Sequence, residues 1–238
     1  MKKAPFAFGV LILGAGASTR MGRCKLLLPW DDKTILTHLL DQWCHAGAAQ
    51  IAPVIDPSNQ LLQEALAHAG FSRSDWIENS SPHLGMFSSL QEGSRWTGWF
   101  PTLTHFAICL GDQPHIQMLT LGMLLDTARK NPMRICQPAL HGRAGHPIVL
   151  PAPNFRELAQ RNVANLRDYV RSHEALRLRM PVEDPGVSQD LNTSEDYMRW
   201  KPKEWDKSEQ LQSIPVFPLS GTERERFVDN PFLSKRER

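Results

Sequence analysis

The chain has 238 residues, of which 41% are hydrophobic and 22% are charged, and its formal net charge is +2. This length and apolar content are enough for one α/β domain, predicted over residues 1–200, with an extension. The nearly neutral charge gives no reason to expect nucleic acid or an anionic membrane as a partner, and no apolar run approaches the ~20 residues of a membrane-spanning helix.

The first predicted element is a buried strand that leads into a glycine-rich loop. The apolar run of residues 8–13 is followed by three glycines within residues 14–22, with Arg20 and Lys25 inside and just after them. Glycine lets the backbone bring its N–H groups close to an anion, and the two cations can neutralise phosphate charge. The stretch therefore predicts a phosphate-binding loop.

The glycines and cations of this stretch fit the other common glycine loops less well. A dinucleotide-binding loop needs G-x-G-x-x-G, but Thr19 stands where the third glycine belongs. A Walker A loop ends in Gly-Lys-Ser/Thr, whereas Gly22 is followed by Arg23. A turn without a ligand has no use for the two cations. A signal peptide is a further alternative, because Met1-Lys2-Lys3 precedes the apolar run, but its cleavage would remove the loop.

A helix, a strand and a second helix are predicted next. Residues 34–46 place apolar side chains at helical spacing, and Gly47 is the stop signal. Residues 51–55 form a short strand, followed by a turn that opens a helix ending near residue 68. Asp56 ends the strand but lies about twice as far from the glycines as the ribose-binding carboxylate of a dinucleotide domain. We therefore assign Asp56 to a turn or a helix cap.

Residues 79–93 combine a polar loop with the start of a helix, after a brief strand at residues 76–77. Gly85 lies in the loop and Ser89 near the start of the helix. Helix amino ends and hydroxyl groups at the mouth of a loop suit the base or ribose of a nucleotide. A serine that only caps the helix is the alternative.

The next strand, residues 106–110, ends in the sequence Gly-Asp-Gln-Pro. Ligands of open parallel sheets bind outside the carboxyl ends of the strands, so Asp112 is well placed to hold a metal ion over phosphates. The alternative is an Asp-Pro turn that caps the following helix, residues 116–129. We favour the metal site.

The rest of the domain contains further strands and helices. The strands are predicted at residues 134–139, 145–150 and 176–182, and the helices at residues 154–160 and 165–172. His146 begins the second of these strands, where it either contacts a substrate or packs structurally. Thr193 and Asp196 have the positions of an N-cap and a first-turn acid.

The periodic pattern ends near residue 200. Residues 201–238 carry mixed charges around short apolar segments and predict a tail that is flexible or packed on the domain. The four cysteines lie far apart without a C-x-x-C pair. Neither a zinc site nor a disulfide framework is therefore predicted, and a reducing, cytoplasmic compartment is expected.

Five motifs, in chain order, resemble one family. LGAGASTRMGRCK resembles the L-A-A-G-x-S-x-R-M-G-x-x-K signature of nucleotidyltransferases, most closely of molybdenum cofactor cytidylyltransferases of the MobA/MocA type. The segments GMFSSLQEG, GDQP, GHP and DLNTSEDY resemble the later motifs of that family. Gly14 replaces an Ala, Cys24 a Pro, Asn192 an Asp and Ser194 a Pro of the family pattern.

The resemblance implies a three-layer α/β/α, Rossmann-like nucleotidyltransferase fold with a mostly parallel sheet, as the alternation of strands and helices also predicts. The nucleotide-binding positions it implies are Leu13, Gly14, Ala15, Gly16, Ala17, Ser18, Gly22, Lys25, Gly85 and Ser89. The implied catalytic residues are Lys25 at the α-phosphate, Arg20 at the outer phosphates and Asp112. Asp112 would hold Mg²⁺, and either Asp190 or Asn192 would supply a second contact, with Asp190 preferred. His146 would lie on the acceptor side.

The reaction implied by the resemblance is transfer of a nucleoside monophosphate from an NTP to a phosphorylated acceptor. Ala15 stands where guanylyltransferases usually have glycine, which favours CTP as donor and molybdopterin as acceptor. A molybdoenzyme or a chaperone is a candidate protein partner. Three alternatives stay open: transfer with another nucleotide or acceptor, an NAD(P)-binding oxidoreductase, and a nucleotide-binding regulator or maturation factor without transfer activity.

Overall fold

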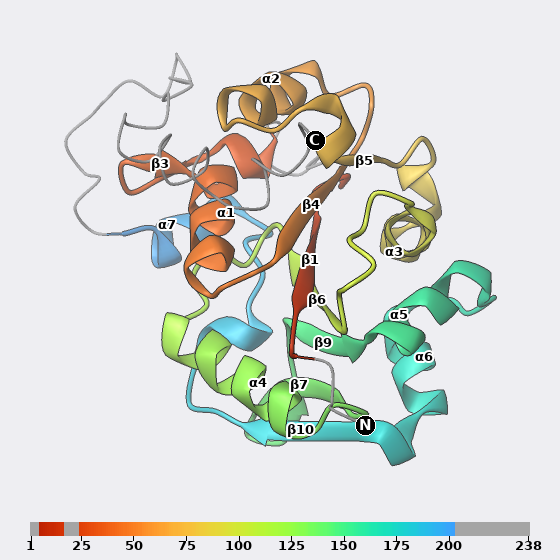
Figure 1. The fold of residues 1–238 in the computed structure, drawn as a ribbon. Coiled ribbons are helices and arrows are strands. Elements are labelled where there is room, and N and C mark those ends of the chain that lie inside the picture. Colours follow the sequence, from red (N-terminus) through yellow and green to blue (C-terminus); the bar gives the residue numbers. More distant parts are fainter. Residues whose placement is uncertain (1–4, 17–23, 203–238) are drawn as a thin grey trace.

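The computed structural model describes residues 5–16 and 24–202. Its main sheet has the strand order β10-β7-β9-β6-β1-β4-β5, and β8 pairs with β7 (Figure 1). The strands are β1 (Phe8–Leu13), β4 (Gln50–Ile55), β5 (Ile77–Glu78), β6 (His105–Leu110), β7 (Ile135–Leu140), β8 (Arg143–Ala144), β9 (Ile148–Pro151) and β10 (Arg177–Pro181). β8 and β9 run antiparallel to their neighbours, whereas the other pairs are parallel. The predicted mostly parallel sheet is confirmed.

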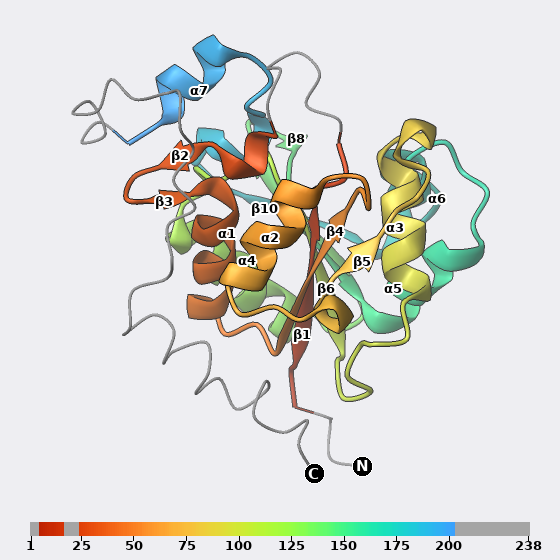
Figure 2. The same ribbon diagram turned by 90° about the horizontal axis from the view of Figure 1, so that it is seen from above.

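Helices cover both faces of this sheet (Figures 1 and 2). One face carries α1 (Ile35–His45), α2 (Gln60–His68) and α4 (Met118–Lys130), and the other carries α3 (Met86–Arg95), α5 (Ala152–Glu157) and α6 (Leu166–Ser172). Strand side chains alternate between the two faces: Val10 and Ile12 join the first core, and Leu11 joins the second. The predicted three-layer fold is therefore confirmed.

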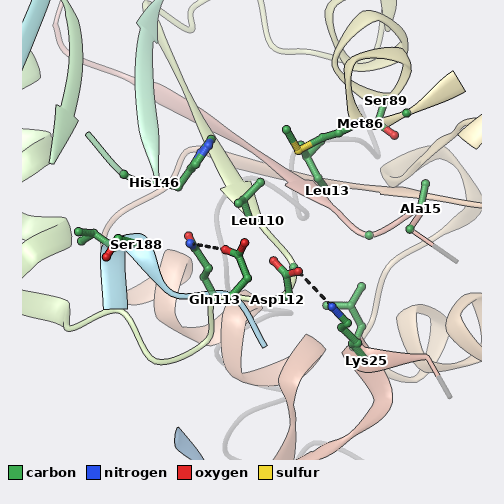
Figure 3. Close-up of a pocket in the computed structure, with 18 of the residues that line it drawn as sticks. Leu13, Ala15, Lys25, Met86, Ser89, Leu110, Asp112, Gln113, His146 and Ser188 are labelled. Carbon is green, nitrogen blue, oxygen red and sulfur yellow. Dashed lines mark hydrogen bonds and ion pairs between the residues drawn. The ribbon is translucent and has the colours of Figure 1, made fainter. Parts of the chain in front are cut away.

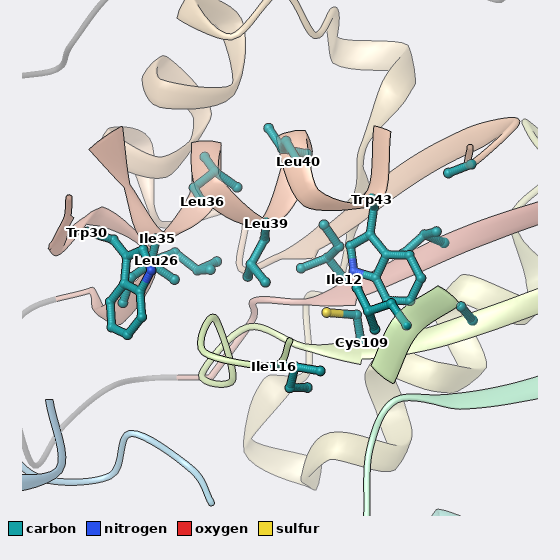
Figure 4. Close-up of a cluster of buried hydrophobic side chains, with 14 of the residues drawn as sticks. Ile12, Leu26, Trp30, Ile35, Leu36, Leu39, Leu40, Trp43, Cys109 and Ile116 are labelled. Atoms are coloured by element: carbon teal, nitrogen blue, oxygen red, sulfur yellow. The ribbon is translucent and has the colours of Figure 1, made fainter. Parts of the chain in front are cut away.

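The core beneath α1 fixes the region where β1 leaves the sheet. Leu39 and Trp43 on α1 are at most 1% exposed and lie over Ile12, and Leu36 is buried in the same cluster (Figure 4). Burying a side chain of this size stabilises the fold by about 1.5–3 kcal/mol. The same core holds Leu26, so the backbone on both sides of the glycine loop is anchored in it.

One hairpin and several boundaries differ from the prediction. A hairpin of β2 (Pro29–Trp30) and β3 (Lys33–Thr34), which was not predicted, precedes α1. β9 begins at Ile148 rather than at residue 145, so His146 lies before the strand, and α5 begins at Ala152 rather than at residue 154. The described chain also contains α7 (Ser194–Trp200). The predicted start of α4 at residue 116 is wrong, because the helix begins at Met118. Its cap is the buried Asp184, which accepts hydrogen bonds from the Gln117 backbone (2.9 Å) and the Thr120 hydroxyl (2.8 Å).

Two local predictions are confirmed. Asp56 accepts hydrogen bonds from the backbone and hydroxyl of Ser58, at 2.8 and 2.6 Å, and thus stabilises a turn. Thr193 and Asp196 form a capping box at the start of α7. Both interactions join neighbours in the sequence, which is why residue order alone could predict them.

The predicted tail lies almost entirely outside the described residues, as do Ala17, Ser18, Arg20 and Gly22 of the loop. In the described ranges, the helices are too short or too polar to cross a membrane. All four cysteines are free thiols. Burial raises the pKa of Cys109 to about 12 and that of Cys136 to about 11, so neither thiol is a ready nucleophile.

Candidate functional site

A cavity of about 660 Å³ lies where several strands end (Figure 3). Its lining comes from the segments after β1 and β6, from the start of α3 and from the turn before β9. Because β9 runs antiparallel to β6, the amino end of β9 lies at the same edge as the carboxyl end of β6. The site thus occupies the edge at which open parallel sheets bind ligands.

The two glycines after β1, Gly14 and Gly16, lie in different packing environments. The Gly14 N–H donates to the Val54 carbonyl at 2.8 Å, and a Cβ at this position would lie 2.5 Å from a Leu26 methyl group. A larger residue at position 14 would therefore require the Leu26 side chain to shift. A Cβ at Gly16 would meet nothing within 4 Å. Glycine is not required by packing there, and the open backbone is accessible to an anion.

Lys25 connects three distant parts of the chain. It begins a short 3₁₀ helix whose next residues, Leu26 and Leu27, are buried in the core. Its Nζ lies 3.3 Å from Oδ2 of Asp112 and donates to Oδ1 of Asn192 at 3.1 Å. The lysine is therefore held at the cavity by a carboxylate and an amide, and Asn192 uses its side-chain oxygen for this contact.

Two carboxylates meet at the end of β6. The N–H of Leu191 donates to the Asp112 carbonyl at 2.9 Å, which ties the segment around Asp190 to β6. Gln113 donates from Nε2 to Oδ1 of Asp190 at 2.8 Å. Burial and then the charge of Asp190 raise the pKa of Asp112, and the neighbouring Lys25 opposes them. The pair thus carries an excess of negative charge that a cation would offset.

The donor set fits a hard divalent cation. Asp112 and Asp190 both line the cavity, and carboxylate oxygens are the ligands that Mg²⁺ prefers. In the described ranges no cluster of three or more His, Cys, Asp and Glu side chains could enclose a metal ion. Mg²⁺ is commonly bound by one or two carboxylates together with substrate phosphates, so a two-carboxylate site suits it.

Asn79 organises the start of α3. Its Nδ2 donates to the hydroxyls of Ser88 (2.8 Å) and Ser89 (2.9 Å), and its Oδ1 accepts from the Ser81 backbone. Gly85 precedes the helix with φ of 90°, a conformation that favours glycine. Gly85 and Ser89 line the cavity. Asn79, which the sequence did not single out, therefore fixes the loop and the helix start together.

His146 is held on the opposite side of the cavity as a neutral ring. The backbone N–H of His146 donates to the Val187 carbonyl at 2.9 Å. Burial lowers the pKa of His146 to about 4, although the charge of Asp190 and the backbone of Ile108 act in the opposite direction. Nδ1 of His146 and Oε1 of Gln113 are buried and have no hydrogen-bond partner in the described part of the chain.

The cavity brings together most of the residues predicted from the sequence. Those that line it are Leu13, Gly14, Ala15, Gly16, Lys25, Gly85, Ser89, Asp112, His146 and Asp190. Lining residues that the sequence did not single out include Met86, Gln113, Arg143, Arg167 and Ser188. Met86 and Gln113 stand inside quoted motifs, and Arg143 and Ser188 each lie two positions before one, whereas the residues around Arg167 carry no such signal.

The fold and this cavity define a class: a three-layer α/β protein whose ligand site, at the sheet edge, combines a glycine loop with paired carboxylates. Comparison with known proteins identifies the family within this class. The model of the MobA-like NTP transferase domain matches residues 10–176. The chain belongs to this family.

Several relatives span nearly the same length. Nicotine blue oxidoreductase of Paenarthrobacter nicotinovorans is 29% identical over 206 residues, and molybdenum cofactor cytidylyltransferase of Escherichia coli K12 is 26% identical over 201 residues. Each alignment covers 82% of this chain and 96% of the relative. The crystal structure of Rv0371c from Mycobacterium tuberculosis H37Rv is 27% identical with a TM-score of 0.67, covering 82% of this chain and 97% of that one. A manganese complex of Rv0371C has a TM-score of 0.63 at 24% identity. The match covers 83% of this chain and 98% of that one.

Proposed function

We propose that this protein is a cytidylyltransferase that transfers CMP from CTP to a phosphorylated acceptor, with molybdopterin as the favoured acceptor. The observation that carries the proposal is the convergence of residues 14–16 of the glycine loop, Lys25 and the Asp112–Asp190 pair on one cavity. Family membership and the cytidylyltransferase relative point to the same class of reaction. A cytoplasmic location and a molybdoenzyme or chaperone partner remain predictions.

The proposed step is one displacement at phosphorus. An oxygen of the acceptor's terminal phosphate attacks the α-phosphorus of CTP and forms a new P–O–P bond. The bond between the α-phosphorus and the bridging oxygen breaks, and pyrophosphate leaves with the electron pair. Catalysis of such transfers depends on positioning and on neutralising charge rather than on covalent chemistry by the protein.

The chain's own residues fit these tasks. Backbone N–H groups at Gly14–Gly16 would bind triphosphate oxygens, and Arg20 would neutralise the departing pyrophosphate. Lys25 would stabilise charge at the α-phosphate, and its contacts with Asp112 and Asn192 hold it in place. Ser89 would contact the base or ribose, and neutral His146 the acceptor.

Asp112 and Asp190 would hold the divalent cation that such a reaction uses. When bound, Mg²⁺ would act as a Lewis acid that neutralises phosphate charge. The manganese complex of the relative Rv0371C supports divalent metal use on this fold. Asn192 is a weaker candidate than Asp190 because its side-chain oxygen already accepts from Lys25.

Thermal unfolding with each NTP, with and without Mg²⁺, tests the proposal. A ligand at ~100 times its Kd stabilises the folded state by about 2.7 kcal/mol, and we expect the largest, Mg²⁺-dependent shift with CTP. Asp112→Asn should abolish the Mg²⁺-dependent part of the stabilisation by CTP.

Without ligand near neutral pH, Asp112→Asn should unfold at or above the wild-type temperature, because the raised pKa of Asp112 means that its charged form is disfavoured in the fold.

Asp126→Asn on α4, remote from the cavity, is the matched control and should behave as wild type with CTP. Equal shifts with all NTPs, or a Mg²⁺-dependent shift that survives in Asp112→Asn, would contradict the donor and metal assignments. Pyrophosphate release from CTP with molybdopterin is the decisive activity. CTP binding without pyrophosphate release would instead favour the regulator or maturation factor.

An NAD(P)-linked oxidoreductase is the second candidate, favoured by one observation. The alignment with nicotine blue oxidoreductase covers 82% of this chain and 96% of that protein. A relative of similar size is therefore named as an oxidoreductase. The missing third glycine of a dinucleotide loop argues against it. Stabilisation by NADH or NADPH but by no NTP would reverse the order of the two proposals.

A further inference from the structure

Two arginines line the cavity without a role in the proposed reaction. Arg143 belongs to β8, and Arg167 lies in the first turn of α6. Within residues 5–16 and 24–202, neither guanidinium group has a hydrogen-bond or ion-pair partner. An arginine remains charged at every physiological pH, so both present positive charge to the cavity.

The sheet divides the cavity into two sides. The glycine loop follows β1, and α3, which carries Ser89, packs beside β4 and β5. Asp112 follows β6, the strand between β1 and β9. Arg143 lies beyond it, on the strand paired with β7. α6 is joined through the Tyr169 hydroxyl to Asn154 and Glu157 of α5, and α5 packs on β6 and β9. Both arginines therefore belong to the side away from the glycine loop.

The backbone under each arginine is well defined. β7 and β8 are joined by a two-residue turn in which His141 and Gly142 both have positive φ, 48° and 77°. Such a turn fixes the register of a hairpin and so the position of Arg143. α6 begins at the N-cap Asn165, whose side chain accepts from the Asp168 backbone at 3.0 Å.

Charges within the site do not neutralise the two arginines. The Asp112 carboxylate pairs with Lys25, and Asp190 accepts from Gln113. On α6, the carboxylate of Asp168 accepts from Asn165 and lies 3.9 Å from Arg171. Guanidinium groups bind phosphate oxygens through paired, charge-assisted hydrogen bonds. Two of them on one side of a cavity suit a dianion such as a phosphate monoester.

We propose that Arg143 and Arg167 form the anion subsite that binds the terminal phosphate monoester of the acceptor. The inference rests on the proposed function in identifying this anion as the attacking group. The subsite would hold the phosphate on the β7–β9 side, while the glycine loop holds the triphosphate on the other side. Asp112, at the end of the strand between them, then lies next to the reacting phosphorus.

Binding of a small phosphate monoester tests the subsite directly. The probe is glycerol 3-phosphate, titrated by calorimetry with and without a saturating non-hydrolysable CTP analogue and Mg²⁺, and glycerol is its uncharged counterpart. Arg143→Gln and Arg167→Gln should each weaken binding of the probe by about tenfold, the loss expected for one charge-assisted contact. Arg→Lys at either position should retain only part of the wild-type affinity for the probe, because lysine lacks the planar guanidinium group that forms two parallel hydrogen bonds.

Arg171→Gln is the matched control, since Arg171 lies on α6 but does not line the cavity. It should leave probe binding unchanged, and all variants should keep wild-type stabilisation by CTP. Unchanged probe binding in both test variants, or no saturable binding to the wild type, would overturn the inference. So would loss of CTP binding with intact probe binding, which would assign the arginines to the triphosphate.

The two proposals fail in different measurements. If no NTP stabilises the wild-type protein, the cytidylyltransferase proposal fails. Arginine-dependent binding of glycerol 3-phosphate without nucleotide would still support an anion subsite. If CTP binds but neither arginine affects the probe, only the subsite fails.

Discussion

At the scale of single residues, burial sets the charge of the groups that face the cavity. It raises the pKa of Asp112 and lowers that of His146 to about 4. The raised pKa of Asp112 shows that its charged form is disfavoured without a counter-charge, so a cation would stabilise it. The lowered pKa leaves His146 as an uncharged ring at neutral pH. Two titratable groups that line one cavity thus differ in their need for a counter-charge.

The lowered pKa of His146 predicts a pH dependence of stability. An unfolded histidine binds a proton near pH 6.5, whereas the folded ring does so only near pH 4. The free energy of unfolding should therefore fall as the pH drops from about 6.5 to 4, with His146 contributing up to about 3 kcal/mol. His146→Asn should flatten this curve in urea unfolding at pH 7, 5.5 and 4.5.

The two proteins are compared by how steeply the free energy of unfolding changes with pH, because the substitution also changes packing and so shifts the whole curve. His38, His105 and His115, whose pKa values burial also lowers, are present in both proteins and affect both curves alike. Parallel curves for wild type and His146→Asn would contradict the lowered pKa.

At the scale of elements, the site depends on a close approach between the turn before β9 and the 3₁₀ helix Pro185–Ser188. A Cβ at Gly145 would lie 1.9 Å from the Val187 carbonyl oxygen, and the His146 N–H bonds to the same oxygen. The chain that follows this 3₁₀ helix carries Asp190. Gly145 therefore sets the position of a carboxylate far from it in sequence.

Gly145→Ala should destabilise the fold by about 1–3 kcal/mol, the usual penalty for overpacking, and should reduce the Mg²⁺-dependent stabilisation by CTP because Asp190 is displaced. Gly122→Ala is the matched control. A Cβ there meets nothing within 4 Å inside α4, so alanine should stabilise the protein by about 0.5–1 kcal/mol. Urea unfolding measures both variants, and a Gly145→Ala protein as stable as wild type would refute the tight contact.

At the scale of the whole molecule, the sheet separates the groups that would bind the two proposed ligands. The β1–β4–β5 side presents the glycine loop and α3, and the β7–β9 side presents Arg143, His146 and α6. Asp112 follows β6, the strand between them. In the proposed reaction, this arrangement would place the donor and acceptor phosphates on either side of the carboxylate pair, as a transfer reaction requires.

Hydrogen exchange should detect this division. CTP with Mg²⁺ should slow amide exchange mainly at residues 13–16 and 82–90. Glycerol 3-phosphate, added afterwards, should slow it mainly at residues 143–147 and in the first turn of α6. Amides of α2, which lies on the same face of the sheet as α1, serve as the internal reference. Protection of the glycine loop by both ligands would contradict separate sides.

The sequence by itself determined the layers, most element positions and the motif residues. Alternating apolar runs, glycines and caps act between near neighbours, and the resulting periodicity is visible in the residue order. Asp56 in its turn and Thr193 with Asp196 at α7 illustrate this. The five motifs also indicated which residues would gather at one edge, through a resemblance to a known family.

Only the tertiary structure decided how those residues interact. Lys25 meets Asp112 and Asn192, which lie 87 and 167 positions away, and Gln113 holds Asp190 from 77 positions away. Arg143 and Arg167 line one cavity although one lies on a strand paired with β7 and the other on a helix joined to α5. Such pairings result from packing between distant elements, and no local pattern in the sequence encodes them.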